Sequence, residues 1–480
     1  MESLKQKTKS GLLWSSIERF SNQGVQFVFS IILARILLPS DYGIIAMLSI
    51  FFAVAQTFID SGFSNALIRK PDRTEKDNST AFYFNVIIGL VSYIVLFLIA
   101  PFVADFYKQP ILSPILRVSA LSVIFNSLCI VQQALLTIEV DFKSQAKITL
   151  TSSVITGVLG VFLAYKGYGV WALVFQGVAS QFLRMILFWI ITKWKPCEKF
   201  SKDSFSYLFG YGSKLLASGL LETIYSNLYP IIIGKFFMPA QLGLFSRAQG
   251  LATLPSSNIT GILQRVTFPI LSLIQEDDER LRENYRKFLR MSAYVVFPLM
   301  MLFLSIASPL VRILLTSKWN DCVIYLQILC FAMMWHPIHA INLNLLQVKG
   351  RSDLFLRLEI IKKIIGVSIM VIAIPFGIKA MCFGLAGSSL ISLFINIYYT
   401  GKLINLGYTK QFKDLFPILV NSLILAAIVY FSISLLQSDW SKLIAGILIG
   451  CIYYIGISIV FKPQEWTEIK SLVRKKNENT

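Results

Sequence analysis

The chain has 480 residues, of which 55% are hydrophobic and only 15% are charged, and its formal net charge is +19. Soluble domains have about 25% charged residues. This composition therefore excludes a soluble enzyme, a disordered scaffold and a secreted disulfide-rich protein as descriptions of the whole chain. Apolar stretches of about 20 residues recur from end to end, which is typical of a polytopic membrane protein.

In chain order, the apolar stretches predict about fourteen membrane-spanning helices. Each stretch is long enough, or nearly so, to cross about 30 Å of hydrocarbon at about 1.5 Å per residue. The pairs within 148–192 and 360–401 are joined by the shortest turns, so their division into two helices is the weakest part of the pattern. The predicted spans are 11–33, 42–61, 80–100, 115–137, 148–165, 169–192, 211–234, 242–272, 288–309, 322–346, 360–376, 380–401, 415–436 and 441–461.

The distribution of Lys and Arg predicts the orientation of these spans. The terminal segments and the loops on their side of the membrane carry 32 Lys and Arg, whereas the opposite loops and span ends carry 9. Cytoplasmic loops of membrane proteins are enriched in positive residues, so both termini are predicted to be cytoplasmic. The same rule accounts for most of the positive net charge, and no nucleic-acid partner is expected.

Two segments that lie 200 residues apart resemble each other. IILARILLPSDYG (31–43) and IIIGKFFMPAQLG (231–243) align Pro39 with Pro239 and Gly43 with Gly243. Turns in helical proteins often reuse Pro and Gly, but a duplication would place a cavity between two six-helix lobes near the midplane. The predicted organisation is an N-terminal lobe at 1–200, a C-terminal lobe at 201–410, two extra helices at 411–461 and a basic cytoplasmic tail at 462–480.

Polar side chains inside the predicted spans are the candidates for function. A charge at the centre of a spanning helix costs about 2.5–3.5 kcal/mol on insertion scales, so it usually faces a cavity or a partner. In the first span, residues at spacings of 4, 3 and 4 form one polar stripe, and Glu18 lies beside it. The members of the stripe are Ser15, Arg19, Asn22 and Gln26.

The second, seventh and eighth spans are the other polar ones. Asp60 lies in the second span and Glu222 in the seventh. In the eighth span, Arg247 and Arg265 are 18 residues apart, which is five helical turns and about 27 Å along one face, with Asn258 between them. These spans and the first are the leading two of each lobe, which predicts a hydrophilic cavity lined by both. Mutual neutralisation, such as Glu222 with Arg247, is the alternative that needs no substrate.

The remaining constellations favour structural roles. His336 and His339 lack a third ligand, and the six cysteines form no C-x-x-C pair, so no metal site is predicted. EDDERLRENYRKFLR (276–290) has charges at i,i+3 and i,i+4 spacing, which is typical of a solvated helix. The chain has no P-loop and no G-x-S-x-G motif. Catalytic residues are therefore not predicted, and we expect a protein that is not an enzyme.

Five longer stretches are similar to a known family. They are SIILARILLPSDYGIIAM (30–47), ALLTIEVDFKSQAKI (134–148), GYGVWALV (167–174), TIYSNLYPIIIGKFFMPAQLGLFSRAQGLATLPSSNITGILQRVTFPILS (223–272) and HAINLNLLQVKGRSDLFLRLEIIKK (339–363). On these stretches the chain resembles the Wzx-type polysaccharide flippases, in the branch related to exporters of colanic acid and teichuronic acid. These belong to the multidrug/oligosaccharidyl-lipid/polysaccharide exporter superfamily.

The resemblance implies an all-α protein of two pseudo-symmetric six-helix lobes plus two helices, in the bacterial cytoplasmic (inner) membrane. It implies alternating access that moves an undecaprenyl-diphosphate-linked sugar unit to the outer leaflet for surface polysaccharide synthesis, such as O-antigen, capsule or exopolysaccharide. Basic cavity residues are implied on the first and eighth spans, at places comparable to Arg19, Arg247 and Arg265. A polysaccharide polymerase and chain-length machinery are the implied protein partners.

The polar neighbours of these arginines complete the predicted site. Ser15, Asn22, Gln26 and Asn258 are expected to line the cavity. Glu18, Asp60 and Glu222 are candidates for coupling transport to H⁺ or Na⁺, with a structural salt bridge as an equal explanation. No cofactor is expected.

Two other functions stay open at this point. A multidrug cation antiporter of the same superfamily would favour an acidic cavity, whereas the candidate residues here are mostly basic. A membrane-embedded glycan polymerase or ligase usually has large outer loops with reactive groups, whereas the predicted outer loops are short.

Overall fold

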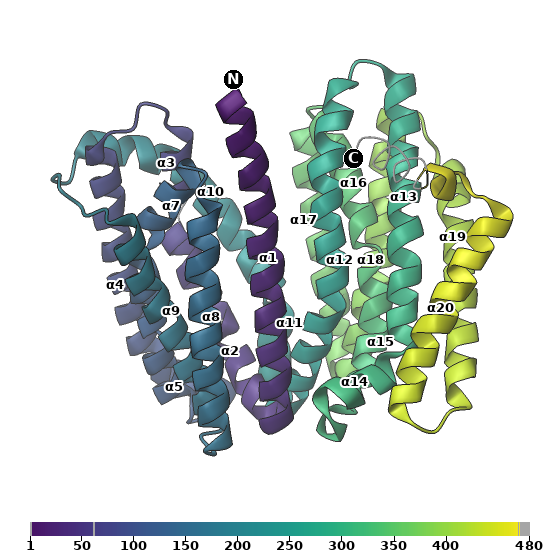
Figure 1. The fold of residues 1–480 in the computed structure, drawn as a ribbon, viewed down its shortest axis with the longest axis horizontal. Coiled ribbons are helices and arrows are strands. Elements are labelled where there is room, and N and C mark those ends of the chain that lie inside the picture. Colours follow the sequence, from purple (N-terminus) through teal and green to yellow (C-terminus); the bar gives the residue numbers. More distant parts are fainter. Residues whose placement is uncertain (1, 61–62, 469, 471–480) are drawn as a thin grey trace. The chain divides into compact units, whose positions relative to one another are not determined.

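The computed structural model describes residues 2–60, 63–468 and 470 of the chain, and for side chains it also leaves out 2–13, 15–17, 211 and 214. The described residues form helices and no strands. Contacts between residues divide the chain into two compact units, residues 1–243 (unit 1) and residues 244–480 (unit 2). Within each unit, long helices pack side by side along a common direction (Figure 1).

Unit 1 contains eleven of the labelled helices and the start of a twelfth. In chain order they are α1 (Glu2–Ile36), α2 (Pro39–Asp60), α3 (Phe63–Arg69), α4 (Glu75–Tyr107), α5 (Leu112–Ser119), α6 (Leu121–Ser127), α7 (Ile130–Ile138), α8 (Phe142–Tyr165), α9 (Val170–Thr192), α10 (Lys202–Ser226) and α11 (Leu228–Phe236).

Unit 2 begins within α12, which runs without a break through Pro255 and Pro269. Its helices are α12 (Pro239–Leu273), α13 (Asp278–Ser305), α14 (Ala307–Leu315), η1 (Ser317–Trp319), α15 (Cys322–Met333), α16 (His336–Val348), α17 (Ser352–Ala373), η2 (Ile374–Phe376), α18 (Gly377–Leu403), α19 (Tyr408–Ser434) and α20 (Asp439–Phe461).

Every predicted span coincides with helical structure. Four of them, 115–137, 211–234, 288–309 and 322–346, are divided into shorter consecutive helices. Among the described residues, ten helical stretches are long and apolar enough to cross a membrane, and one of these contains both α17 and α18. The ten do not include α1, α10–α11 or α12, which carry most of the polar residues singled out in the sequence, whereas Asp60 lies in α2, which is included. The all-α polytopic membrane fold is therefore confirmed, whereas the number fourteen stays a prediction.

The short turns divide both of the ambiguous pairs of spans. Between α8 and α9, Gly167 and Gly169 have φ angles of 84° and 54°, and between α17 and α18, Gly377 has a φ of 87°. Residues with a Cβ rarely adopt such angles, whereas glycine does so at little cost. Glycine thus permits the reversal of direction within a few residues.

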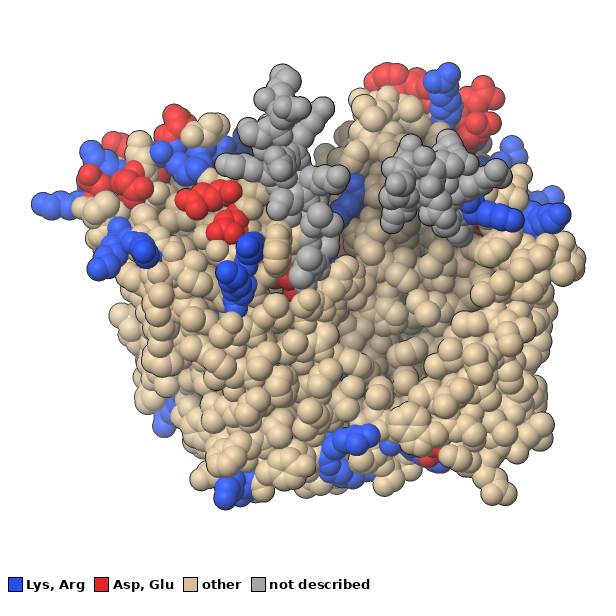
Figure 2. All heavy atoms as spheres, in the orientation of Figure 1, with Lys and Arg blue, Asp and Glu red and all other residues tan. Residues whose placement is uncertain are grey.

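Apolar side chains cover the outside of the long helices. Helix α4 exposes Ile87, Val91, Ile94 and Leu98, and α20 exposes Ile452 and other large apolar side chains along its length. On the face in Figure 2, the charged side chains of each unit lie at the helix ends, with a belt of uncharged residues between them. Water-soluble proteins rarely expose such large apolar areas, and the hydrocarbon core of a bilayer is the solvent that fits them.

The two repeated turns contact each other within unit 1. A Cβ added at Gly43 would lie 1.7 Å from the carbonyl oxygen of Pro239, and one added at Gly243 would lie 1.8 Å from that of Pro39. Any side chain at either glycine would force the backbones apart. The contact is reciprocal, as expected of two copies related by a local two-fold axis. The lobe boundaries at 200, 410 and 461 depend on the duplication itself and stay a prediction.

Candidate functional site

Arg19 and Arg265 are the two candidate arginines whose guanidinium groups no other described residue engages. Arg19 lies in α1 and Arg265 in α12, and both side chains are exposed. Among the described residues, no ion pair or hydrogen bond engages either group. In a helix that enters the membrane, an arginine without a carboxylate keeps its full positive charge and its five N–H donors for another partner.

Arg247 lies in a different environment from Arg265 on the same helix. Its side chain is half-buried and engaged by neighbouring groups, and its charge acts on the Cys322 thiol at the start of α15. Asn258 is likewise half-buried and engaged. Close by, Ser256 donates to the carbonyl oxygen of Met333 at 2.7 Å, which ties the middle of α12 to the end of α15. The middle of α12 is therefore held by a hydrogen bond to α15, whereas the side chain of Arg265 is exposed.

The polar stripe of α1 is partly satisfied by α8. Ser153 donates to the Asn22 side-chain oxygen at 2.8 Å, and Gln26 donates to the same oxygen at 3.4 Å. Ser15 belongs to the stripe by its backbone position, but its side chain lies outside the described part. The structure thus brings Asn22 and Gln26 together, and it places them at the contact between α1 and α8.

The three candidate acids differ in their surroundings. Glu18 is half-buried, and the charge of Arg184 in α9 acts on it. Asp60 accepts a hydrogen bond from Gln56 at 2.8 Å, and Gln56 accepts one from Asn126 in α6 at 2.7 Å. Glu222 is exposed on α10 and has an interaction partner. The coupling role of these acids stays a prediction.

The sequence did not single out the hydroxyl and amide pairs between α2 and α10. Thr57 and Thr223 share a hydrogen bond of 2.9 Å, and Ser49 donates to Asn227 at 3.2 Å. Ser and Thr are frequent in membrane helices, where they bond to their own backbone, so their presence alone gives no signal. Only the packing of α10 on α2 shows that these residues face each other.

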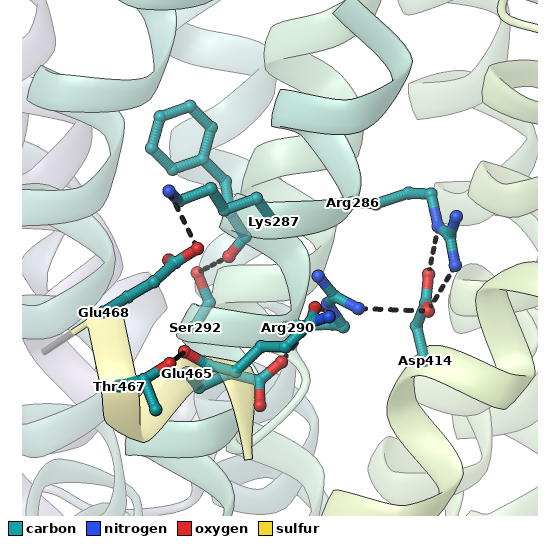
Figure 3. A network of polar contacts seen from close by, with 10 residues as sticks. Arg286, Lys287, Arg290, Ser292, Asp414, Glu465, Thr467 and Glu468 are labelled. Atoms are coloured by element: carbon teal, nitrogen blue, oxygen red, sulfur yellow. Dashed lines mark hydrogen bonds and ion pairs between the residues drawn. The ribbon is translucent and has the colours of Figure 1, made fainter. Parts of the chain in front are cut away.

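The run 276–290 departs from the predicted solvated helix. Arg280 does pair with Asp277 at i,i+3, but Arg286 donates to both carboxylate oxygens of Asp414 in α19, each at 2.7 Å. Arg290 pairs with Glu465 at 3.2 Å (Figure 3). The α13 helix packs along α19, so one face of the run holds a long-range ion-pair network and the other faces solvent.

The exposed His336 and the half-buried His339 both lie next to polar side chains. His336 contacts the Thr260 hydroxyl at 3.2 Å, and His339 lies 3.2 Å from both the Ser389 hydroxyl and the Asn396 amide. In the part of the chain that the structure describes, no group of three or more His, Cys, Asp or Glu side chains is arranged to hold a metal ion. Each histidine thus has a polar side chain within hydrogen-bonding distance, and the absence of a metal site stays a prediction.

Comparisons with known proteins agree with this architecture. Residues 32–324 match the family described as "Polysaccharide biosynthesis protein". The chain is 24% identical over 473 residues to the teichuronic acid biosynthesis protein TuaB of Bacillus subtilis (strain 168), with 97% of this chain and 98% of TuaB covered. It is 25% identical over 376 residues to the lipopolysaccharide biosynthesis protein WzxC of Escherichia coli (strain K12), with 77% and 76% covered.

A solved structure has a similar fold. The lipid II flippase MurJ in an inward closed conformation superposes with a TM-score of 0.75 at 16% sequence identity, over 94% of this chain and 98% of MurJ. At this identity the likeness establishes the shared fold. The predicted all-α polytopic fold is therefore confirmed.

Proposed function

This chain belongs to the polysaccharide biosynthesis protein family, and we propose that it is a flippase for undecaprenyl-diphosphate-linked sugar repeat units. The substrate would pass from the cytoplasmic to the outer leaflet by alternating access, without a covalent change. The observation that carries the proposal is the pair of exposed arginines, Arg19 and Arg265, which no other described residue engages. Relatives that act in teichuronic acid and lipopolysaccharide biosynthesis support the choice of substrate class.

The chemistry of the substrate requires such groups. A diphosphate and a polar oligosaccharide are strongly disfavoured in hydrocarbon, so a transporter must replace the water around them. Arginine binds phosphate oxygens through two parallel N–H donors and stays charged even where the dielectric constant is low. The prenyl chain needs no such help and can stay in the bilayer.

The positions of the arginines along their helices suggest a direction. At about 1.5 Å per residue, Arg19 is about 12 Å from the cytoplasmic end of its predicted span, and Arg265 is about 10 Å from the same end of its own. Arg247 is nearer the outer end of α12. In the proposed cycle, Arg19 and Arg265 receive the diphosphate from the cytoplasmic side, and Arg247 accepts it before release.

The proposal extends to cellular context. The protein would lie in the bacterial cytoplasmic membrane with both termini in the cytoplasm, as the excess of Lys and Arg in the inside loops favours. A polymerase and chain-length machinery would use the flipped units. Glu18, Asp60 and Glu222 are the candidate groups for coupling to H⁺ or Na⁺.

A leaflet-protection assay tests the proposal. Purified protein is reconstituted into liposomes with labelled lipid-linked oligosaccharide extracted from the native host. An enzyme that acts on the labelled glycan is then added outside, where it reaches only the lipid in the outer leaflet. We expect protein-dependent exchange between leaflets, with the recovered lipid unchanged in mass. Recovery of an elongated or transferred glycan would instead favour a polymerase or ligase. Absence of lipid exchange together with efflux of a cationic dye would favour a multidrug antiporter.

A further inference from the structure

A second candidate binding site lies inside unit 1, and its wall on α1 begins at Gln26, about two helical turns from Arg19. It is a pocket of about 300 Å³ lined by residues of α1, α8 and α9 and by Tyr42 of α2. This volume is at the lower end of the range for small-molecule pockets, about 300–1,000 Å³. Helices α8 and α9, which form two of its walls, are long and apolar enough to cross a membrane, and α1 packs along α8, so we place the pocket at membrane depth.

The pocket presents polar groups without protein partners. The side chains of Gln176 and Ser180 on α9 line it, and neither makes a hydrogen bond among the described residues. The Ser153 and Ser30 hydroxyls, also in the wall, instead donate to protein oxygens. At membrane depth an unpaired amide or hydroxyl is costly, so α9 presents these two groups to water or to a polar ligand.

The chemistry of the wall restricts that ligand. Every residue of the lining is uncharged: amides, hydroxyls, a glycine, two leucines and the aromatic rings of Phe29 and Tyr42. Such a wall has nothing to neutralise a diphosphate or a cationic drug. Amides and hydroxyls exchange hydrogen bonds with sugar hydroxyls, and aromatic rings pack against the C–H face of a sugar ring.

Two glycines shape the pocket. Gly160 on α8 allows the Gln176 side chain to lie against the helix backbone, because a Cβ there would come within 2.8 Å of the amide. Gly177 is exposed at the wall, and a Cβ added there would find no atom within 4 Å. The first glycine positions the amide, and the second keeps the space next to it open.

We propose that this pocket binds one neutral sugar ring of the lipid-linked oligosaccharide, with Gln176 and Ser180 as specificity-determining residues. The inference rests on the proposed function. It divides substrate recognition into two parts. The arginines bind the diphosphate that all such lipids share, and the pocket recognises the glycan, which differs between them.

The test compares two lipids in binding to the purified full-length protein in nanodiscs. One is the undecaprenyl-diphosphate-linked oligosaccharide extracted from the native host, and the other is undecaprenyl diphosphate without sugar. We expect the wild type to bind the glycan-bearing lipid about tenfold more tightly, which corresponds to one or two neutral hydrogen bonds. Gly177→Leu, which fills the pocket, and Gln176→Ala, which empties it, should abolish this preference and leave the affinity for the sugar-free lipid unchanged.

The controls separate the possible failures. Gly456→Leu in α20 adds the same side chain where a Cβ also meets no atom within 4 Å, and it should keep the preference. An intact preference in both pocket variants would overturn the pocket and leave the flippase standing. An equal loss of affinity for both lipids would also overturn it, because it would mean a general disturbance of the fold. A wild type that binds neither lipid would overturn the proposed function together with the pocket.

Discussion

The arginines of α13 and those of α1 and α12 carry the same side chain in opposite surroundings. Arg286 donates two hydrogen bonds to Asp414, whose side chain is only 6% exposed. Arg19 and Arg265 are exposed, and nothing among the described residues engages them. A guanidinium group that is satisfied by a carboxylate holds two helices together, whereas one without a carboxylate is ready for an anionic ligand. The comparison separates charges that stabilise the fold from charges available to a substrate.

The largest effect on stability is expected from Asp414→Asn. The change removes the negative charge that Arg286 binds at 2.7 Å and that Arg290 approaches at 4.0 Å. We expect a loss of about 2–3 kcal/mol in the free energy of unfolding, below the value for a fully buried pair because Arg286 is partly exposed. Chemical denaturation in detergent micelles measures it. Asp353→Asn, in the exposed pair with Arg351, is the matched control and should leave the free energy of unfolding almost unchanged.

Arg265→Lys should affect transport and leave stability unchanged. Lysine keeps the positive charge but loses the planar, two-donor geometry that matches phosphate. We expect the transport rate to fall about tenfold, equivalent to about 1.4 kcal/mol, while the free energy of unfolding changes by less than about 0.5 kcal/mol. Initial rates in the leaflet-protection assay report the first quantity. A large loss of stability instead would place Arg265 with the structural arginines.

Tyr285→Phe tests the hydrogen bonds that α13 makes with uncharged side chains. The buried Tyr285 hydroxyl lies 2.9 Å from the Asn342 side-chain oxygen and 3.1 Å from that of Gln411. Removing it should cost about 1 kcal/mol of unfolding free energy, because Thr400 still donates to Asn342. Transport per folded molecule should be unchanged. A selective loss of transport would show that this end of α13 takes part in the cycle.

The smallest effect is expected from Lys287→Ala. Lys287 pairs with Glu468 at 2.9 Å, but the two side chains are 46% and 32% exposed. Exposed ion pairs contribute about 0–1 kcal/mol, and salt screens them. We expect a change below about 0.5 kcal/mol that disappears at high ionic strength. A salt-independent loss comparable to that of Asp414→Asn would mean that exposure is a poor guide to the role of these charges.

The sequence predicted local features of this molecule well. Each apolar stretch became helical because its length and composition are local properties, and Gly167 and Gly377 mark turns that only glycine permits easily. The repeated Pro and Gly of these two turns also proved to be informative, since Gly43 and Gly243 contact each other's turn.

Features that depend on neighbouring helices were not predictable. The spacing within 276–290 indicated pairs along one helix, but Arg286 binds Asp414, which is 128 residues away. The spacing in α1 identified its polar stripe, but it did not indicate that Asn22 accepts a hydrogen bond from Ser153 of α8. Periodicity identifies the polar face of a helix, and only the fold determines which neighbour meets that face. Gln176 and Ser180 were missed for the same reason.

The central claim is that open arginines, and not paired ones, bind the diphosphate of the substrate. The most direct measurement is the leaflet-protection assay on Arg19→Gln/Arg265→Gln, with Arg357→Gln, an exposed arginine on α17, as the control. Each arginine lost removes charge-assisted hydrogen bonds of about 1.5–3 kcal/mol, so the account predicts at least a 100-fold fall in transport for the double variant with unaltered unfolding. Transport at the wild-type rate by the folded double variant would contradict it.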